Sequence, residues 1–153
     1  MIQHILHKDI LYAIIVRRNF KKEGIEFFTP NEFSQQLGYM SRPQGYIVEP
    51  HLHLRAVKEI FYTQEVLLIR SGKLRVDFYN NEMEYFASEV LAEGDIIMLA
   101  QGGHGFEMLE PTEIIEIKQG PFNADLDKKS FTMDRDKEIK MYGEWGRTRN
   151  FEG

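Results

Sequence analysis

Two of the five histidines in this 153-residue chain are only two positions apart, at His51 and His53. On a β-strand, residues i and i+2 point to the same side, with Cα atoms about 6.6 Å apart. Two imidazoles at that spacing can bind one metal ion or act together on one substrate. They can equally be structural histidines at the end of a strand. The spacing alone leaves both interpretations open.

Glycines at fixed distances frame the other candidate residues. Gly45 precedes His51 with five residues between them, and Glu65 precedes Gly72 with six between them. A third histidine, His104, follows a pair of glycines. These spacings resemble the cupin superfamily, whose first motif is G-x5-H-x-H-x3-4-E-x6-G and whose second is G-x5-P-x-G-x2-H-x3-N. The resemblance covers roughly residues 45 to 120.

The resemblance implies a small double-sheet β-barrel, commonly dimeric, that holds a divalent metal with three histidines and a glutamate. Carried onto this sequence, the metal ligands are His51, His53, Glu65 and His104. The chain departs from the first motif because eleven residues separate His53 from Glu65, which leaves Glu59 as an alternative carboxylate. We prefer Glu65, since the Gly72 turn fixes its register and places it on one face with Leu67 and Ile69.

The second motif also departs from the family pattern. Ala100 stands at the proline position, one residue is missing before His104, and no asparagine follows. A narrower resemblance, to a bacterial cupin subgroup associated with cell-surface polysaccharide and sugar biosynthesis, is carried by the three stretches Gln64-Glu65-Val66, Gly102 to Glu107 and Lys118-Gln119-Gly120-Pro121. It implies a carbohydrate-related substrate and no particular reaction.

Three imidazoles and one carboxylate would leave an octahedral ion with two open positions. Such a site could polarise a carbonyl, lower the pKa of bound water or bind dioxygen. Because the ligands are nitrogen and oxygen, Zn, Fe, Mn, Ni and Co all fit. We expect the site to face an open, partly polar pocket. Three further residues are candidates for catalysis: Glu49 and Glu107, either as carboxylates near the ligands or as surface residues, and Tyr62 as an acid.

Three functions follow as hypotheses. The first is a metal-dependent enzyme, an isomerase, epimerase or dioxygenase, that acts on a small, polar, sugar-derived metabolite. The second, which the resemblance prompts, is a metal-free sugar isomerase or epimerase in which His51 or His53 is the base and Tyr46 or Tyr62 is the acid. The third is a non-catalytic sensor of a sugar or a metal. The sequence does not separate enzyme from sensor.

The elements that must position these residues are strands. Glycine and proline recur at short intervals, and the segments between them are rich in Val, Ile, Tyr and Phe. About nine strands are predicted, at Leu11–Arg17, Ile25–Thr29, Tyr46–Leu54, Ile60–Ile69, Leu74–Tyr79, Met83–Leu91, Ile96–Leu99, Phe106–Leu109 and Glu113–Lys118. From residue 73 to 78, apolar and charged residues alternate, which predicts one buried face and one face in water. This pattern predicts an all-β sandwich, jelly roll or small barrel. The resemblance implies, among these, a cupin-type double-stranded β-helix, that is, a jelly-roll barrel.

The chain divides into a barrel domain, residues 1–122, and a C-terminal appendage, residues 123–153. The appendage carries charge runs and few core-forming residues. It is predicted to be a short helix or an arm that lies over a partner subunit through Phe131, Met133, Tyr142 and Trp145. One small barrel would leave apolar strand faces uncovered, so we expect a homodimer.

Composition restricts the partners. The formal net charge is −5, which repels phosphate backbones and makes nucleic acid an improbable partner. No cysteine is present, so disulfides and thiolate metal sites are excluded. The longest apolar run, residues 11 to 16, is too short to cross a membrane, and basic residues follow it where a secretory signal would have them first. We therefore expect a cytoplasmic protein without a membrane partner.

Overall fold

A computed structural model describes residues 1–121, 123, 127–134, 137, 140, 141 and 143. In this part the chain forms ten strands: β1 (Ile2–His7), β2 (Ile10–Val16), β3 (Gly24–Phe27), β4 (Gly38–Ser41), β5 (Glu65–Ser71), β6 (Lys73–Tyr79), β7 (Tyr85–Ala92), β8 (Ile96–Leu99), β9 (Gly103–Met108) and β10 (Glu113–Lys118). No helix among the described residues is long and apolar enough to span a membrane.

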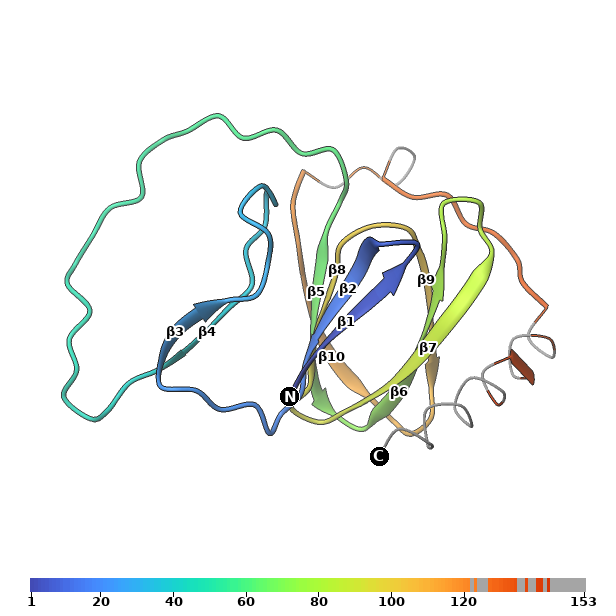
Figure 1. The fold of residues 1–153 in the computed structure, drawn as a ribbon, viewed down its shortest axis with the longest axis horizontal. Coiled ribbons are helices and arrows are strands. Elements are labelled where there is room, and N and C mark those ends of the chain that lie inside the picture. Colours follow the sequence, from blue (N-terminus) through green and yellow to red (C-terminus); the bar gives the residue numbers. More distant parts are fainter. Residues whose placement is uncertain (122, 124–126, 135–136, 138–139, 142, 144–153) are drawn as a thin grey trace.

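The strands form two main antiparallel sheets (Figure 1). One has five strands in the order β1-β2-β8-β5-β10, and the other has three in the order β7-β6-β9. Strands β3 and β4 make a separate two-stranded sheet. The all-β prediction is confirmed. A closed barrel is not formed, because β9 and β10 each end a different sheet and are not hydrogen-bonded to each other.

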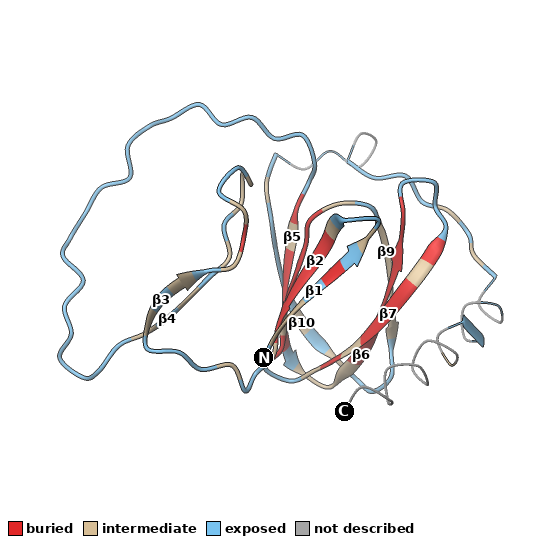
Figure 2. Cartoon of the chain, in the orientation of Figure 1, coloured by how far each residue is buried: buried red, intermediate tan, exposed pale blue. Residues whose placement is uncertain are grey.

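The core lies between the two main sheets. On β6, the alternate residues Leu74, Val76 and Phe78 are almost completely buried. They belong to the same apolar cluster as Leu67 and Ile69 of β5. Figure 2 shows this burial concentrated on the strands of the two sheets. The inward direction predicted for Leu67 and Ile69 is therefore confirmed, and Glu65, two residues earlier on the same strand, shares their face.

The alternation predicted that the second face of β6 is in water, but in the structure this face is buried. Arg75 is 8% exposed and Asp77 is 5% exposed. Residues 127–133, which we call the covering segment, line the same cavity as these two side chains. Within that segment, Phe131 packs edge-on against Tyr79 of β6, with ring centroids 5.2 Å apart. The prediction was wrong because a segment remote in sequence covers this face.

The loop between β4 and β5 departs most from the sequence-based predictions. No strand forms at Tyr46–Leu54, and the strand predicted at Ile60–Ile69 begins only at Glu65. All residues from 42 to 63, here called the exposed segment, are exposed, and the loop extends away from both sheets (Figure 1). A strand needs a neighbour for its backbone groups, and this segment pairs with no strand in the described part of the chain.

The C-terminal appendage lies partly within the described residues. Phe131 packs against Tyr79 of its own chain. Residues 137, 140, 141 and 143 are helical, in agreement with a short helix. Tyr142 and Trp145, which were also predicted to contact a partner, lie outside the described residues.

Candidate functional site

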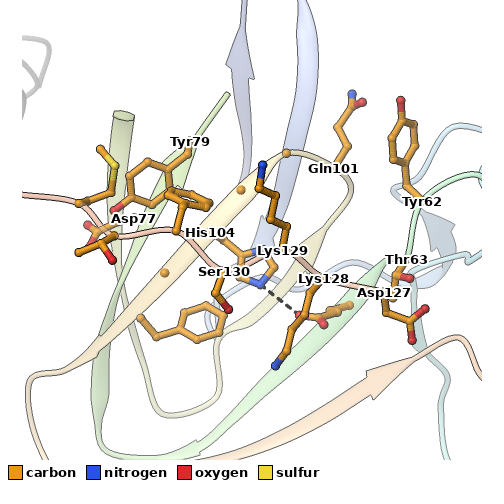
Figure 3. A pocket seen from close by; sticks show the side chains of 18 of the residues that line it. Tyr62, Thr63, Asp77, Tyr79, Gln101, His104, Asp127, Lys128, Lys129 and Ser130 are labelled. Atoms are coloured by element: carbon orange, nitrogen blue, oxygen red, sulfur yellow. Dashed lines mark ion pairs between the residues drawn. The ribbon is translucent and has the colours of Figure 1, made fainter. Parts of the chain in front are cut away.

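A cavity of about 620 Å³ opens at the free edge of the three-stranded sheet. Its walls come from the start of β5, most of β9, the outer face of β6, the end of β10 and the covering segment. The polar residues that line it include Tyr62, Thr63, Glu65, Arg75, Asp77, Gln101, His104, Glu107, Lys118, Asp127, Lys128, Lys129 and Ser130. Figure 3 shows most of these side chains from close by.

Glu65 and His104 form the central pair of this cavity. Glu65 Oε2 lies 3.2 Å from His104 Nε2, and the two side chains are 18% and 29% exposed (Figure 3). They meet because both lie on strand faces that point toward the core between the two sheets. Glu65 shares the inward face of β5 with Leu67, while His104 is paired with Phe78 in the β6–β9 register. Two of the four residues predicted as metal ligands therefore meet in the structure.

Lys118 adds a positive charge beside this pair. It is opposite Glu65 in the β5–β10 register, with Nζ 3.6 Å from Glu65 Oε1 and 2.6 Å from Glu116 Oε1. The hydrogen bond from His104, and then the charges of His104 and Lys118, lower the pKa of Glu65 although burial opposes the shift. The bond to Glu116, followed by the charges of Glu116 and Glu65, raises the pKa of Lys118. At neutral pH the site thus holds a carboxylate and an ammonium group.

A second polar group supports the wall formed by β6. Arg75 donates to both oxygens of Asp77, at 2.8 and 2.9 Å, and its guanidinium also lies 3.0 Å from Glu107 Oε2. Ser88 donates to Asp77 as well, and the Ser88 and Tyr85 hydroxyls are 2.8 Å apart. The bond to Asp77 raises the pKa of Arg75. Because β9 alternates, Glu107 lies on the face opposite to His104, and its carboxylate binds Arg75.

His51 and His53 lie elsewhere. Both are on the exposed segment and neither lines the cavity. Their rings are 5.2 Å apart, and His51 Nδ1 is 2.9 Å from the carbonyl oxygen of Glu49, a bond that requires the proton on Nδ1. Glu49 and Glu59 are also exposed and outside the cavity lining. The strand predicted at Tyr46–Leu54, on which His51 and His53 would share one face, is not formed.

The fit to a metal ion is partial. Glu65 and His104 supply one carboxylate oxygen and one imidazole nitrogen at a common point, which suits a divalent ion. Among the described residues no group of three or more histidine, aspartate or glutamate side chains is placed to hold an ion. Completing the predicted ligand set would require the exposed segment to fold back over the cavity.

Several cavity residues were missed as functional candidates. Arg75 and Asp77 were assigned to a wet strand face, and the signal that could have identified them was their i, i+2 spacing with opposite charges. Lys128 and Lys129 lie in a charge run of the appendage, and no local pattern connects them to the histidines. Tyr62 does line the cavity, as a half-exposed residue at the end of the exposed segment.

The chain was compared with family models, curated proteins and solved structures. No family model, no curated protein and no solved structure matches the chain.

Proposed function

We propose that the chain is a small-molecule enzyme that acts on a polar, carbohydrate-related metabolite in this cavity, with His104 as the group that transfers the proton. The observation that carries this proposal is the His104–Glu65 contact of 3.2 Å inside an open polar cavity. A histidine held by a carboxylate, beside space for a ligand, is the usual arrangement for general acid–base catalysis.

The roles of the two residues follow from the direction of the hydrogen bond. Glu65 accepts from Nε2–H, so neutral His104 carries its lone pair on Nδ1. That lone pair can take a proton from a carbon next to a carbonyl and return it to the same or a neighbouring carbon. Such a reaction is an isomerisation or epimerisation and requires no oxidant. Glu65 is a positioning residue that stabilises the imidazolium, and Tyr62 is the candidate acid at the mouth.

We also propose that the two sheets correspond to a cupin-type jelly roll. Two of the glycines in the motifs have a structural reason to be glycine. Gly72 has φ +80°, and a Cβ there would collide with the carbonyl oxygen of Pro111. Gly102 has φ +76°, and a Cβ there would collide with the ring of Tyr12. These turns set the start of β6 and the start of β9, which carries His104.

A second candidate function is a divalent-metal site formed by His51, His53, Glu65 and His104. It is favoured by the two imidazoles of the exposed segment, whose centroids are 5.2 Å apart, and by the continuity of that segment with Glu65. A bound Zn, Fe, Mn, Ni or Co ion would supply a Lewis acid or a dioxygen site. In this case Glu65 and His104 would hold the ion in place of exchanging a proton.

We further propose that a second copy of the chain covers the exposed segment. The segment carries nine exposed large apolar side chains: Tyr46, Ile47, Val48, Leu52, Leu54, Val57, Ile60, Phe61 and Tyr62. Burying most of them would remove about 1,000 Å² per chain, which exceeds the roughly 800 Å² per partner of a standard interface. The same surface on two copies can pair with itself around a two-fold axis.

The proposed reaction can be tested by proton exchange with solvent. The protein is incubated in D₂O with D-glucose, D-glucose 6-phosphate or D-glucuronate, which all open to an aldehyde, and deuterium in the recovered sugar is measured by mass spectrometry. Exchange that disappears in His104→Gln and falls in Glu65→Gln is expected. Binding without exchange would refute the enzyme and indicate a sensor. Exchange that persists in His104→Gln would refute the role of this histidine.

A further inference from the structure

The carboxylates of the cavity are already engaged. Glu65 is held by His104 and Lys118, and Asp77 and Glu107 are both held by Arg75. The fourth, Asp127, accepts a hydrogen bond of 2.6 Å from the backbone amide of Asn123. These contacts pair the positive charges of Lys118 and Arg75 with negative ones. Glu65, Asp77 and Glu107 thus each have a cationic partner, whereas Asp127 keeps its negative charge at the start of the covering segment.

The two lysines of the covering segment are in a different situation. Lys128 and Lys129 line the cavity, are exposed, and form no ion pair with any described residue. Figure 3 shows both side chains among those that line the cavity with His104. Ser130, which also lines the cavity, adds a hydroxyl beside them. Together they present two ammonium groups and an O–H donor around the same space.

The covering segment is fixed where it carries these groups. Phe131 packs against Tyr79, and its ring is the nearest neighbour of the space beside Gly103. A side chain on Gly103 would meet that ring at 3.0 Å, so the glycine permits the close approach. The lysines are thus held at the cavity by an aromatic contact two and three residues away in the sequence. Their ammonium groups remain in solvent, where they can meet an incoming ligand.

We infer that Lys128, Lys129 and Ser130 bind an anionic group of the substrate, a phosphate or a carboxylate, while the sugar portion extends toward His104. The inference rests on the proposed function, because it assumes a sugar-derived ligand. The protein as a whole is negatively charged at −5, so it does not attract anions by its overall field. Attraction must come from local cations that have no ion-pair partner among the described residues, and these two lysines supply them. A neutral sugar would not use them.

The test compares three reducing sugars that share a pyranose ring and differ in charge: neutral D-glucose, and the anions D-glucose 6-phosphate and D-glucuronate. Binding to the full chain is measured by titration calorimetry at low and high salt. We expect both anionic probes, or one of them, to bind at least about tenfold more tightly than glucose, with affinity falling as salt rises. Preference for one anion identifies the group as phosphate or as carboxylate. Equal affinity for glucose and for both anions overturns the inference, as does no binding of either anion.

Substitutions show which residues cause the tighter binding of the anionic sugars. The double substitution Lys128→Gln with Lys129→Gln should weaken the preferred anionic probe by about tenfold and remove most of its salt dependence. The control, Lys21→Gln with Lys137→Gln, removes two exposed lysines outside the cavity lining and should leave affinity within about twofold. Unchanged affinity in the Lys128 and Lys129 double variant contradicts the assignment. All four side chains are exposed, so neither variant is expected to unfold.

One further variant separates this inference from the proposed function. His104→Gln should retain the preference for the anionic probe, because the lysines are intact, and should lose proton exchange. If the wild type binds the anionic sugar and shows no exchange, the anion site stands and the enzyme proposal fails. If exchange occurs equally with neutral and anionic sugars of equal affinity, the enzyme stands and the anion site fails.

Discussion

The imidazole of His104 lies 3.2 Å from the carboxylate of Glu65, and this contact joins the beginning of β9 in one sheet to the first residue of β5 in the other. Since the two sheets share no hydrogen-bonded strands, the pair is one of the polar links across the open edge of the fold.

The first prediction concerns pH. Because the folded state lowers the pKa of Glu65, this group contributes stability above its ordinary value of 4.5, and that contribution is lost as the pH falls through the lowered value. The melting temperature of the wild type should therefore fall by about 2 to 4 °C more than that of Glu65→Gln between pH 7 and pH 3. Glu113→Gln, which removes an exposed carboxylate paired with Arg70, is the control and should follow the wild type. Parallel curves for wild type and Glu65→Gln would contradict the prediction.

The second prediction concerns the buried arginine. Arg75→Ala removes the partner of Asp77 and leaves a buried carboxylate without its cation, so the free energy of unfolding should fall by about 3 to 5 kcal/mol. Denaturant unfolding measures the change. The matched control is Arg70→Ala, whose side chain is 68% exposed and pairs with an equally exposed Glu113, and it should cost less than about 1 kcal/mol. Equal effects of the two substitutions would show that Arg75 is not structurally buried.

The third prediction tests the turn between β5 and β6. Gly72→Ala combines a positive φ with a Cβ that collides with backbone, so it should destabilise the fold by at least about 2 kcal/mol. Gly45→Ala has a similar φ of +83° but meets nothing within 4 Å, and it should cost only about 1 kcal/mol. Thermal unfolding of the two variants gives the comparison. A larger loss for Gly45→Ala would refute the collision at Gly72.

The fourth prediction addresses the metal alternative. If all four predicted ligands act together, protein incubated with Zn²⁺, Fe²⁺ or Mn²⁺ and then desalted should retain about one ion per chain, measured by elemental analysis. The double substitution His51→Ala with His53→Ala should then abolish retention, as should His104→Ala. The control is His4→Ala, a histidine on β1. Full occupancy in the double variant would exclude His51 and His53 as ligands and leave the Glu65–His104 half-site.

The fifth prediction concerns assembly. Light scattering at micromolar concentration should give the mass of a dimer, and Val57→Asp with Phe61→Asp should shift it to a monomer. Val57 is 99% exposed and Phe61 is 83% exposed within one chain, so the substitutions should not disturb the chain's own core. A wild-type monomer would contradict the proposed dimer. A dimer that survives both substitutions would move the interface away from the exposed segment.

The local sequence pattern by itself determined the bounds of several strands and the direction of some of their side chains. Strands β8 (Ile96–Leu99) and β10 (Glu113–Lys118) have the bounds predicted from the sequence, because a short apolar or alternating run between turn residues has few other conformations available. The inward direction of Leu67 and Ile69 was predictable for the same reason, since the Gly72 turn fixes the register. That direction also identified Glu65, and not the exposed Glu59, as the carboxylate that meets His104.

Tertiary structure decided the rest. Alternation along β6 shows that Arg75 and Asp77 share a face, but whether that face is wet depends on residues 127–133, which pack there from a remote part of the sequence. The strand β1 was missed because its half-polar pattern is stabilised by pairing with β2. His51 and His53 had the spacing of a strand, yet a strand forms only beside a partner, and the described part of the chain offers them none. Spacing fixes which side chains can point together, and only the packing of distant segments decides whether they do.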